Sequence, residues 1–238
     1  MKRKTLSVII PAYNEEKTID KVLEAVAKAE VSISKEVIIV NDGSTDSTKE
    51  TVENFLKNSK YKKDIKFRLI NKPNGGKGSA VKLGFKEATG DIVLIQDADL
   101  EYNPNEYQQL IEPILSGEHK VVYGSRQLNK KNKGYSTLSF YLGGLSVTLL
   151  TNLLYFSRLT DEPTCYKVFH SDVIKNIEIK GNKFEWEPEV TAKILKRGIK
   201  IHEVPISYFP RSFRDGKKIN WRDGIQALWT LVKYRFKD

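Results

Sequence analysis

Short apolar runs alternate with amphipathic stretches through the first half of the chain. The apolar runs are brief and rich in β-branched residues, which favours buried strands over helices; they lie at 6–10, 36–40, 66–70, 92–95 and 121–123. The stretches between them begin with polar or acidic residues and predict helices starting near 14, 46, 79 and 104. Strands separated by helices predict an α/β fold with a mostly parallel sheet and right-handed crossovers.

The central apolar run leads directly into a pair of acidic residues. Ile92–Ile95 is followed by Asp97 and Asp99, which are separated by one residue, so both side chains can point to one spot beyond the strand end. Carboxylates that converge in this way repel one another unless a cation lies near them. Mg²⁺ and Mn²⁺ prefer oxygen ligands and are often shared with substrate phosphates. Glu101 adds a third candidate oxygen, although a solvated acidic loop would show the same pattern.

Polar turns follow three of the predicted strands, at 11–15, 41–46 and 96–99. Any one of them is more often a plain connection than a site, but together they would share one edge of the sheet, where α/β proteins bind ligands. They therefore favour a nucleotide pocket, with Glu15 and Asp42 suited to ribose or base and the helix start after Gly43 suited to an anion. A glycine-rich turn at 75–78 places Lys77 where a phosphate could bind, but it lacks the full P-loop pattern and fits a tight turn equally well.

Composition and net charge limit the classes of partner that the chain is expected to bind. The chain has 238 residues, 39% of them hydrophobic, and a formal net charge of +10, which suggests nucleic acid, a phosphorylated substrate or an anionic membrane as a partner. Cys165 is the single cysteine, so an internal disulfide is excluded. The basic N-terminus lacks the apolar region of a signal peptide. His119, His170 and His202 are scattered without metal-ligand spacing, and we expect them to be structural.

The second half contains a long uncharged segment and an amphipathic end. Residues 134–157 carry no charge, and 138–156 is long enough for a marginal transmembrane helix, but its Gly, Ser, Thr and Asn residues dilute the hydrophobicity. One or two helices lying on a membrane or covering the sheet fit better, and a buried core helix fits nearly as well. Residues 221–236 combine an apolar stripe with Trp, Tyr and basic residues, which suits a bilayer interface or docking on the domain.

Several motifs together resemble the family 2 glycosyltransferases with the GT-A fold. They are Ser7–Glu15, Val40–Asp46, Gly76–Gly78, Asp97–Asp99, Tyr123–Arg126, 163–169, Pro188–Glu189 and Val204–Ile206, in the order of that family and over nearly the whole chain. Within the family the chain is most similar to the dolichol-phosphate mannosyltransferases and related polyprenyl-phosphate glycosyltransferases.

The resemblance implies roles for individual residues. A Mg²⁺ or Mn²⁺ ion would be held by Asp99 and Glu101, and Arg126 would face the reacting phosphates. The family's basic C-terminal loop corresponds to 210–218, and either Arg211 or Arg214 could take its phosphate role. The implied catalytic residues are Asp97, Asp99, Arg126, Arg211, Arg214 and Lys218, and the implied nucleotide-sugar ligands are Pro11, Tyr13, Glu15, Asp42, Gly43, Lys77, Asp97 and Ala98.

The expected activity is the inverting, metal-dependent transfer of mannose or glucose from GDP-mannose or UDP-glucose to a polyprenyl phosphate. Two alternatives stay open: transfer to a saccharide or protein hydroxyl, with Glu187 or Glu189 as general base, and a nucleotide-sugar-binding module without turnover. We expect a GT-A domain over 1–218, a C-terminal amphipathic helix over 219–238, and a peripheral position on the cytoplasmic face of an anionic membrane. Nucleic acid is not expected as a partner, because it would not explain the acidic pocket.

Overall fold

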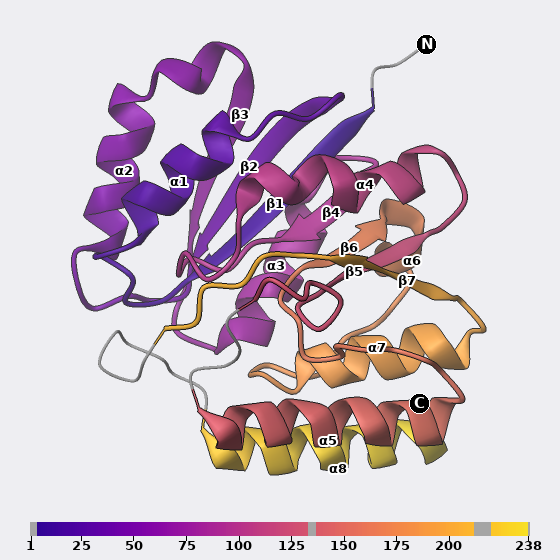
Figure 1. Ribbon diagram of the computed structural model, residues 1–238. Helices are drawn as coiled ribbons and strands as arrows, with labels where there is room; N and C mark the ends of the chain where they lie inside the picture. The colour runs from indigo at the N-terminus through magenta and orange to yellow at the C-terminus, as the bar shows by residue number, and fades with distance from the viewer. Residues whose placement is uncertain (1–3, 133–136, 212–219, 238) are drawn as a thin grey trace.

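A seven-stranded sheet forms the centre of the computed structural model, which describes residues 4–132, 137–211 and 220–237. The strand order is β3-β2-β1-β4-β6-β5-β7 (Figure 1). The bounds are β1 Thr5–Ala12, β2 Ser34–Asn41, β3 Ile65–Asn71, β4 Ile92–Ile95, β5 Val121–Ser125, β6 Lys167–His170 and β7 Ile201–Pro205.

The sheet is mostly parallel, which confirms the predicted fold class. β3, β2, β1 and β4 run parallel to one another, and β5 runs parallel to β7. β6 is antiparallel to both β4 and β5, and no such strand was predicted. Val168 and Phe169 are buried in this insertion, so it extends the core.

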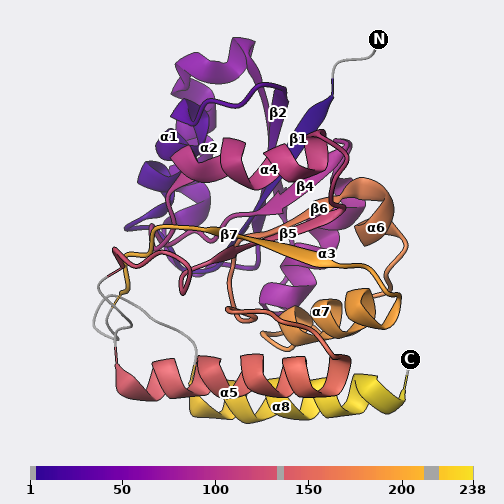
Figure 2. The same cartoon turned by 45° about the vertical axis from the view of Figure 1, so that its right-hand side comes forward.

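Helices cover both faces of the sheet. Figures 1 and 2 show α1, α2 and α4 on one side and α3, α6 and α7 on the other. The bounds are α1 Ile19–Lys28, α2 Thr48–Asn58, α3 Lys77–Glu87, α4 Tyr107–Leu115, α5 Leu138–Tyr155, α6 Ser171–Lys175, α7 Trp186–Lys196 and α8 Trp221–Phe236, with short 3₁₀ helices η1 Lys60–Lys63 and η2 Pro104–Glu106.

The first two helices begin later than the sequence suggested. Asn14 has a φ of +50°, and its side-chain oxygen accepts a hydrogen bond from Thr45 N, so it belongs to a turn and α1 starts at Ile19. The second helix starts at Thr48, after a turn in which Gly43 has a φ of +70°. The turn residues that precede these two helices lie at the carboxyl edge of the sheet.

α5 and α8 form a separate layer beneath α7 (Figures 1 and 2). Thr137 caps the start of α5, and a capping box between Asn220 and Asp223 starts α8. The layer is fixed by a small apolar cluster of Val147, Ala192, Leu231 and Tyr234. The predicted domain boundary at 218 lies outside the described residues.

α5 has an unusual surface for a packed helix. By length and composition it could cross a membrane, with a mean hydropathy of 1.3, yet only 22% of it is buried. It is one continuous helix, lies on α8 rather than on the sheet, and exposes much of its apolar side. A buried core helix, one of the alternatives from the sequence, is therefore wrong.

Candidate active site

The polar turns after β1, β2 and β4 meet at one edge of the sheet. Asn14 N donates to Ser44 Oγ at 3.0 Å, and Glu15 N donates to Thr48 Oγ1 at 2.8 Å. From the third turn, the carbonyl of Ala98 accepts a hydrogen bond from Thr18 Oγ1 at 2.7 Å. These contacts join the segments that the sequence placed together.

Asp42 is buried and holds the glycine-rich turn. Its carboxylate accepts hydrogen bonds from Gly75 N at 3.0 Å and Gly76 N at 2.8 Å, and it is paired with Lys72. In this conformation Asp42 shapes the pocket wall, and contact with a nucleoside stays a prediction. Gly43 is needed at its position, since a Cβ atom there would lie 2.6 Å from Asn74 N.

At the start of α2, where an anion site was expected, protein carboxylates accept hydrogen bonds from two backbone N–H groups. Asp46 Oδ1 accepts a hydrogen bond from Thr48 N at 3.0 Å, and Glu16 Oε2 accepts one from Ser47 N at 3.0 Å. Two N–H groups at this helix start are therefore occupied in this conformation, and binding of an anion there stays a prediction.

The glycine-rich turn before α3 packs against the loop 181–183. Gly78 N and Ser79 N donate to the carbonyls of Lys183 and Asn182. A Cβ atom on Gly76 would lie 2.5 Å from Asn182 O. These glycines let the 181–183 loop approach the helix start, so the backbone N–H groups of this turn do not form an open phosphate cradle.

Lys77 connects the two sides of the site. Its Nζ lies 2.8 Å from Asp97 Oδ1 and 3.0 Å from Glu187 Oε1. Although burial acts in the opposite direction, these carboxylates raise the pKa of Lys77 well above its ordinary value. Lys77 is therefore charged, and Asp97 and Glu187 share its charge.

Arg211 lies among the carboxylates assigned to the metal. Its Nη2 is 2.8 Å from Asp99 Oδ2 and its Nη1 is 3.2 Å from Glu15 Oε2. Its backbone N donates to Glu101 Oε1 at 2.7 Å. Burial, Asp97 and Glu101 raise the pKa of Asp99 to about 7, although the charge of Arg211 acts in the opposite direction.

The residues present fit a divalent metal shared with a ligand. Asp99 and Glu101 offer carboxylate oxygens at the place where Arg211 now supplies positive charge. Within the described ranges, no group of three or more His, Cys, Asp or Glu side chains could hold a metal ion alone. Two carboxylates completed by water and substrate phosphates are the usual arrangement for Mg²⁺.

Arg126 follows β5 and lines a second pocket, of about 520 Å³. Lys130 and Tyr208 line this pocket too, together with Leu138 and Tyr141 from the start of α5. Tyr208 connects it to the acidic corner, because its OH donates to Glu101 at 3.3 Å and its ring centroid lies 5.2 Å from Arg126 Cζ. Sequence reasoning missed Tyr208, which carries no motif signal.

The remaining candidates are placed as follows. Pro11 and Tyr13 lie at the end of β1 and in the turn after it, Tyr13 being partly exposed. His119 stacks on His202 with ring centroids 4.3 Å apart, and His170 caps α6. Arg214 and Lys218 lie outside the described residues.

Glu189 is structural in this arrangement. It is buried, its Oε1 lies 2.6 Å from Lys193 Nζ, and it accepts hydrogen bonds from Lys180 N and Gly181 N. Although burial acts the other way, these donors lower its pKa. It therefore holds the loop that packs against the start of α3.

We expect Glu189→Gln to lower the free energy of unfolding by about 3 kcal/mol, because it leaves Lys193, whose side chain is only 12% exposed, and two backbone amide donors without their charged partner. Chemical denaturation measures this, with the exposed Glu178→Gln as a control expected to change stability by less than about 0.5 kcal/mol. A collapse of turnover in a Glu189→Gln protein of unchanged stability would instead assign Glu189 to the chemistry.

The acidic and basic side chains gather at the carboxyl edge of the sheet, where open α/β proteins bind their ligands. The profile of glycosyl transferase family 2 matches residues 7–177. A dolichyl-phosphate beta-glucosyltransferase of Trichomonas vaginalis is 31% identical over 242 residues, covering 96% of this chain and 72% of that protein. The dolichol-phosphate mannosyltransferase of Pyrococcus furiosus is 29% identical over 238 residues, covering 96% of this chain and 64% of that protein.

The fold is also found in solved structures. Glucosyl-3-phosphoglycerate synthase of Mycobacterium tuberculosis, in complex with Mn²⁺, UDP and glucosyl-3-phosphoglycerate, superimposes with a TM-score of 0.71 at 21% identity, over 99% of this chain and 81% of that one. The chain belongs to glycosyl transferase family 2 and is a glycosyltransferase with the GT-A fold. Its relatives include the dolichyl-phosphate glycosyltransferases.

Proposed function

We propose that the protein transfers a hexose from a nucleotide-sugar to a polyprenyl phosphate, with inversion at the anomeric carbon. The donor, GDP-mannose or UDP-glucose, would bind at the carboxyl edge of β1, β2 and β4. The names of the glucosyl- and mannosyltransferase relatives support the lipid acceptor and do not distinguish the two donors.

The observation that carries this proposal is the composition of the pocket beside the acidic corner. Arg126 and Lys130 line one part of it, and Leu138 and Tyr141 of α5 line another. From there the apolar side of α5 continues outward as exposed Leu142, Leu149 and Leu153. A polyprenyl phosphate has the same division, an anionic head and an apolar chain.

A phosphate acceptor also agrees with the state of the acidic residues. A hydroxyl acceptor would need a general base, whereas a phosphate oxygen is already anionic near neutral pH. Glu187 is paired with Lys77 at 3.0 Å, and Glu189 is buried in structural contacts. Both carboxylates are therefore engaged by lysine or backbone N–H groups of the protein, which does not favour proton removal from a sugar hydroxyl.

The protein groups would divide the task between the two substrates. Asp99 and Glu101 would hold a Mg²⁺ or Mn²⁺ ion, which when bound supplies positive charge to the leaving nucleoside diphosphate. The mycobacterial structure with this fold contains Mn²⁺ and UDP, which supports the use of a divalent metal. Arg126 would orient the acceptor phosphate, and Tyr208 lies between the two parts of the site.

The direct test is a screen of GDP-mannose and UDP-glucose for transfer and hydrolysis, with and without polyprenyl phosphate. We expect one donor to give a polyprenyl-phosphate sugar in the presence of Mg²⁺ or Mn²⁺. Transfer to a soluble saccharide, with none to the lipid phosphate, would overturn the proposal and favour the hydroxyl acceptor.

We further propose that α5, which lies inside the GT-A domain, and α8, the amphipathic helix that follows this domain, rest on an anionic membrane. Their outer surface carries large exposed apolar side chains, and Arg222 and Arg235 add positive charge. The exposed apolar residues of the two helices are Leu138, Tyr141, Leu142, Leu145, Leu149, Leu153, Trp221, Ile225, Trp229 and Phe236. Such a surface suits interfacial binding on the cytoplasmic face.

Liposome co-sedimentation should show binding to anionic vesicles that weakens as salt is raised. The double substitution Leu153→Glu and Trp229→Glu should weaken this binding by about tenfold or more, because both side chains are exposed and would otherwise enter the lipid. Trp229→Phe, which keeps an apolar ring, is the matched control. If the unmodified protein ignores anionic vesicles at low salt, a peripheral position on the membrane is wrong.

A further inference from the structure

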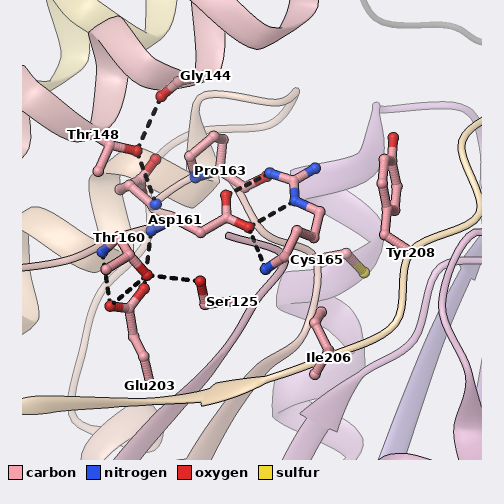
Figure 3. A network of polar contacts seen from close by, with 12 residues as sticks. Ser125, Gly144, Thr148, Thr160, Asp161, Pro163, Cys165, Glu203, Ile206 and Tyr208 are labelled. Carbon is pink, nitrogen blue, oxygen red and sulfur yellow. Dashed lines mark hydrogen bonds and ion pairs between the residues drawn. The ribbon is translucent and has the colours of Figure 1, made fainter. Parts of the chain in front are cut away.

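The Arg126 guanidinium is held by a carboxylate that plays no part in the function described so far. Asp161 Oδ2 accepts hydrogen bonds from Arg126 N at 2.8 Å and Nε at 2.7 Å, and Oδ1 accepts one from Nη2 at 2.6 Å. The carbonyl of Pro163 accepts another from Nη2 at 2.9 Å (Figure 3). One edge of the guanidinium and its plane are thereby fixed.

The segment that carries Asp161 is itself anchored on β7. Glu203 accepts hydrogen bonds from Thr160 N at 2.7 Å and from Asp161 N at 2.9 Å. The hydroxyl of Thr160 lies 2.6 Å from that of Ser125, the residue before Arg126 (Figure 3). Asp161 therefore has little freedom to follow a moving arginine.

The same segment is attached to α5. Glu162 N donates to Thr148 Oγ1 at 3.1 Å, and Thr148 Oγ1 donates to Gly144 O at 2.9 Å (Figure 3). The chain from 160 to 163 thus spans the distance between the apolar helix and the arginine. A lipid phosphate bound in the pocket would contact both ends of this connection, α5 with its chain and Arg126 with its head.

Asp161 cannot act on the substrate directly. Its side chain is 2% exposed, and both oxygens are occupied by Arg126. A buried ion pair contributes little net stability, because the cost of removing two charges from water offsets their attraction. Such a pair can instead fix the orientation of an arginine that binds a phosphate.

We propose that Asp161 is a positioning residue for the lipid-phosphate acceptor: anchored on Glu203 and tied to α5 through Thr148, the 160–163 segment aims Arg126 into the pocket. This inference rests on the proposed function, since it takes the acceptor phosphate as the ligand of Arg126. It assigns to Asp161 an effect on the acceptor and none on the donor.

The test compares Asp161→Asn with the unmodified protein, using farnesyl phosphate as acceptor and the donor selected by the screen above. We expect kcat/KM for farnesyl phosphate to fall by about tenfold to a hundredfold, because small displacements of an orienting group are costly. The KM for the donor should stay within about twofold. Asp172→Asn, the same change at a carboxylate that is 82% exposed, should leave both parameters unaltered.

A double-mutant comparison separates positioning from a structural role and remains informative if Asp161→Asn alone fails to fold. Arg126→Ala with Asp161→Asn removes both members of the buried pair and leaves no unpaired charge. If Asp161 acts through Arg126, this double variant and Arg126→Ala alone should have the same kcat/KM for farnesyl phosphate. A further loss in the double variant would overturn the inference.

The remaining outcomes are distinct. If the unmodified protein transfers sugar to farnesyl phosphate and Asp161→Asn leaves acceptor kinetics unchanged, the positioning role is wrong and the proposed function stands. An equal rise in donor and acceptor KM would also overturn it, because that result indicates general loosening of the fold. If the unmodified protein transfers nothing to any prenyl phosphate, the proposed function fails and the inference fails with it.

Discussion

Asp99→Asn should abolish sugar transfer while leaving the protein folded. The substitution keeps the shape of the side chain and removes the charge that would hold a divalent cation at the acidic corner. We expect turnover at saturating donor to fall by about a thousandfold or more, as when a group that stabilises leaving-group charge is lost. Steady-state kinetics at millimolar Mg²⁺ or Mn²⁺ measures the turnover, and Mn²⁺ binding followed by electron paramagnetic resonance should weaken in parallel.

The fold should tolerate this change because Asp99 is not part of the apolar core. Its side chain is bound to Arg211, which keeps Glu15 as a second partner. Asp20→Asn, the same change at an exposed position of α1, is the matched control and should keep full activity. Near-normal turnover of Asp99→Asn at millimolar metal would show that the metal site has been assigned to the wrong residues.

The sequence predicted β1 to β5 because the signal there is local, whereas β7, which runs parallel to β5, was not predicted. β1, β2 and β4 are runs of β-branched residues buried on both faces, and such runs can be recognised without knowing their partners. β6 has only Lys167–His170, and it becomes a strand through pairing with β4 and β5. The four residues of β6 do not by themselves indicate that the segment pairs with β4 and β5.

The sequence predicted where the candidate site lies, and it did not predict which side chains contact one another there. Each polar turn follows a recognisable strand, so the edge on which the turns meet could be foreseen. The contact between Arg211 and Asp99 joins residues 112 positions apart, and that between Arg126 and Asp161 joins residues 35 positions apart. No spacing rule predicts such pairs.

Local chemistry does not decide between alternatives where several structures share one sequence pattern. A glycine-rich turn before a helix suits a phosphate, and here Gly76 and Gly78 instead admit the 181–183 loop. The start of α2 suits an anion, and Asp46 supplies it from within the chain. In both places the decisive fact is which group fills the space, and that depends on the tertiary structure.

The acceptor class can be decided by comparing substitutions of Arg126 with a substitution of Glu187, which shares Lys77 with Asp97. With a lipid phosphate as acceptor, Arg126→Ala should lower kcat/KM for that acceptor by about a hundredfold or more, because a charge-assisted contact to the phosphate is lost. Glu187→Gln should change turnover by less than about tenfold, because a phosphate oxygen needs no base and Lys77 keeps Asp97 as a partner.

Arg126→Ala also leaves the buried Asp161 unpaired, so its effect must be separated from loss of folded protein. Arg126→Lys keeps the charge and loses the two-pronged geometry, and we expect an intermediate acceptor kcat/KM at a melting temperature closer to that of the unmodified protein. Circular dichroism melting and the donor KM serve as checks on all three variants. A loss of several orders of magnitude for Glu187→Gln, together with a mild Arg126→Ala, would reverse the assignment, because that pattern requires an acceptor whose proton must be removed as the glycosidic bond forms.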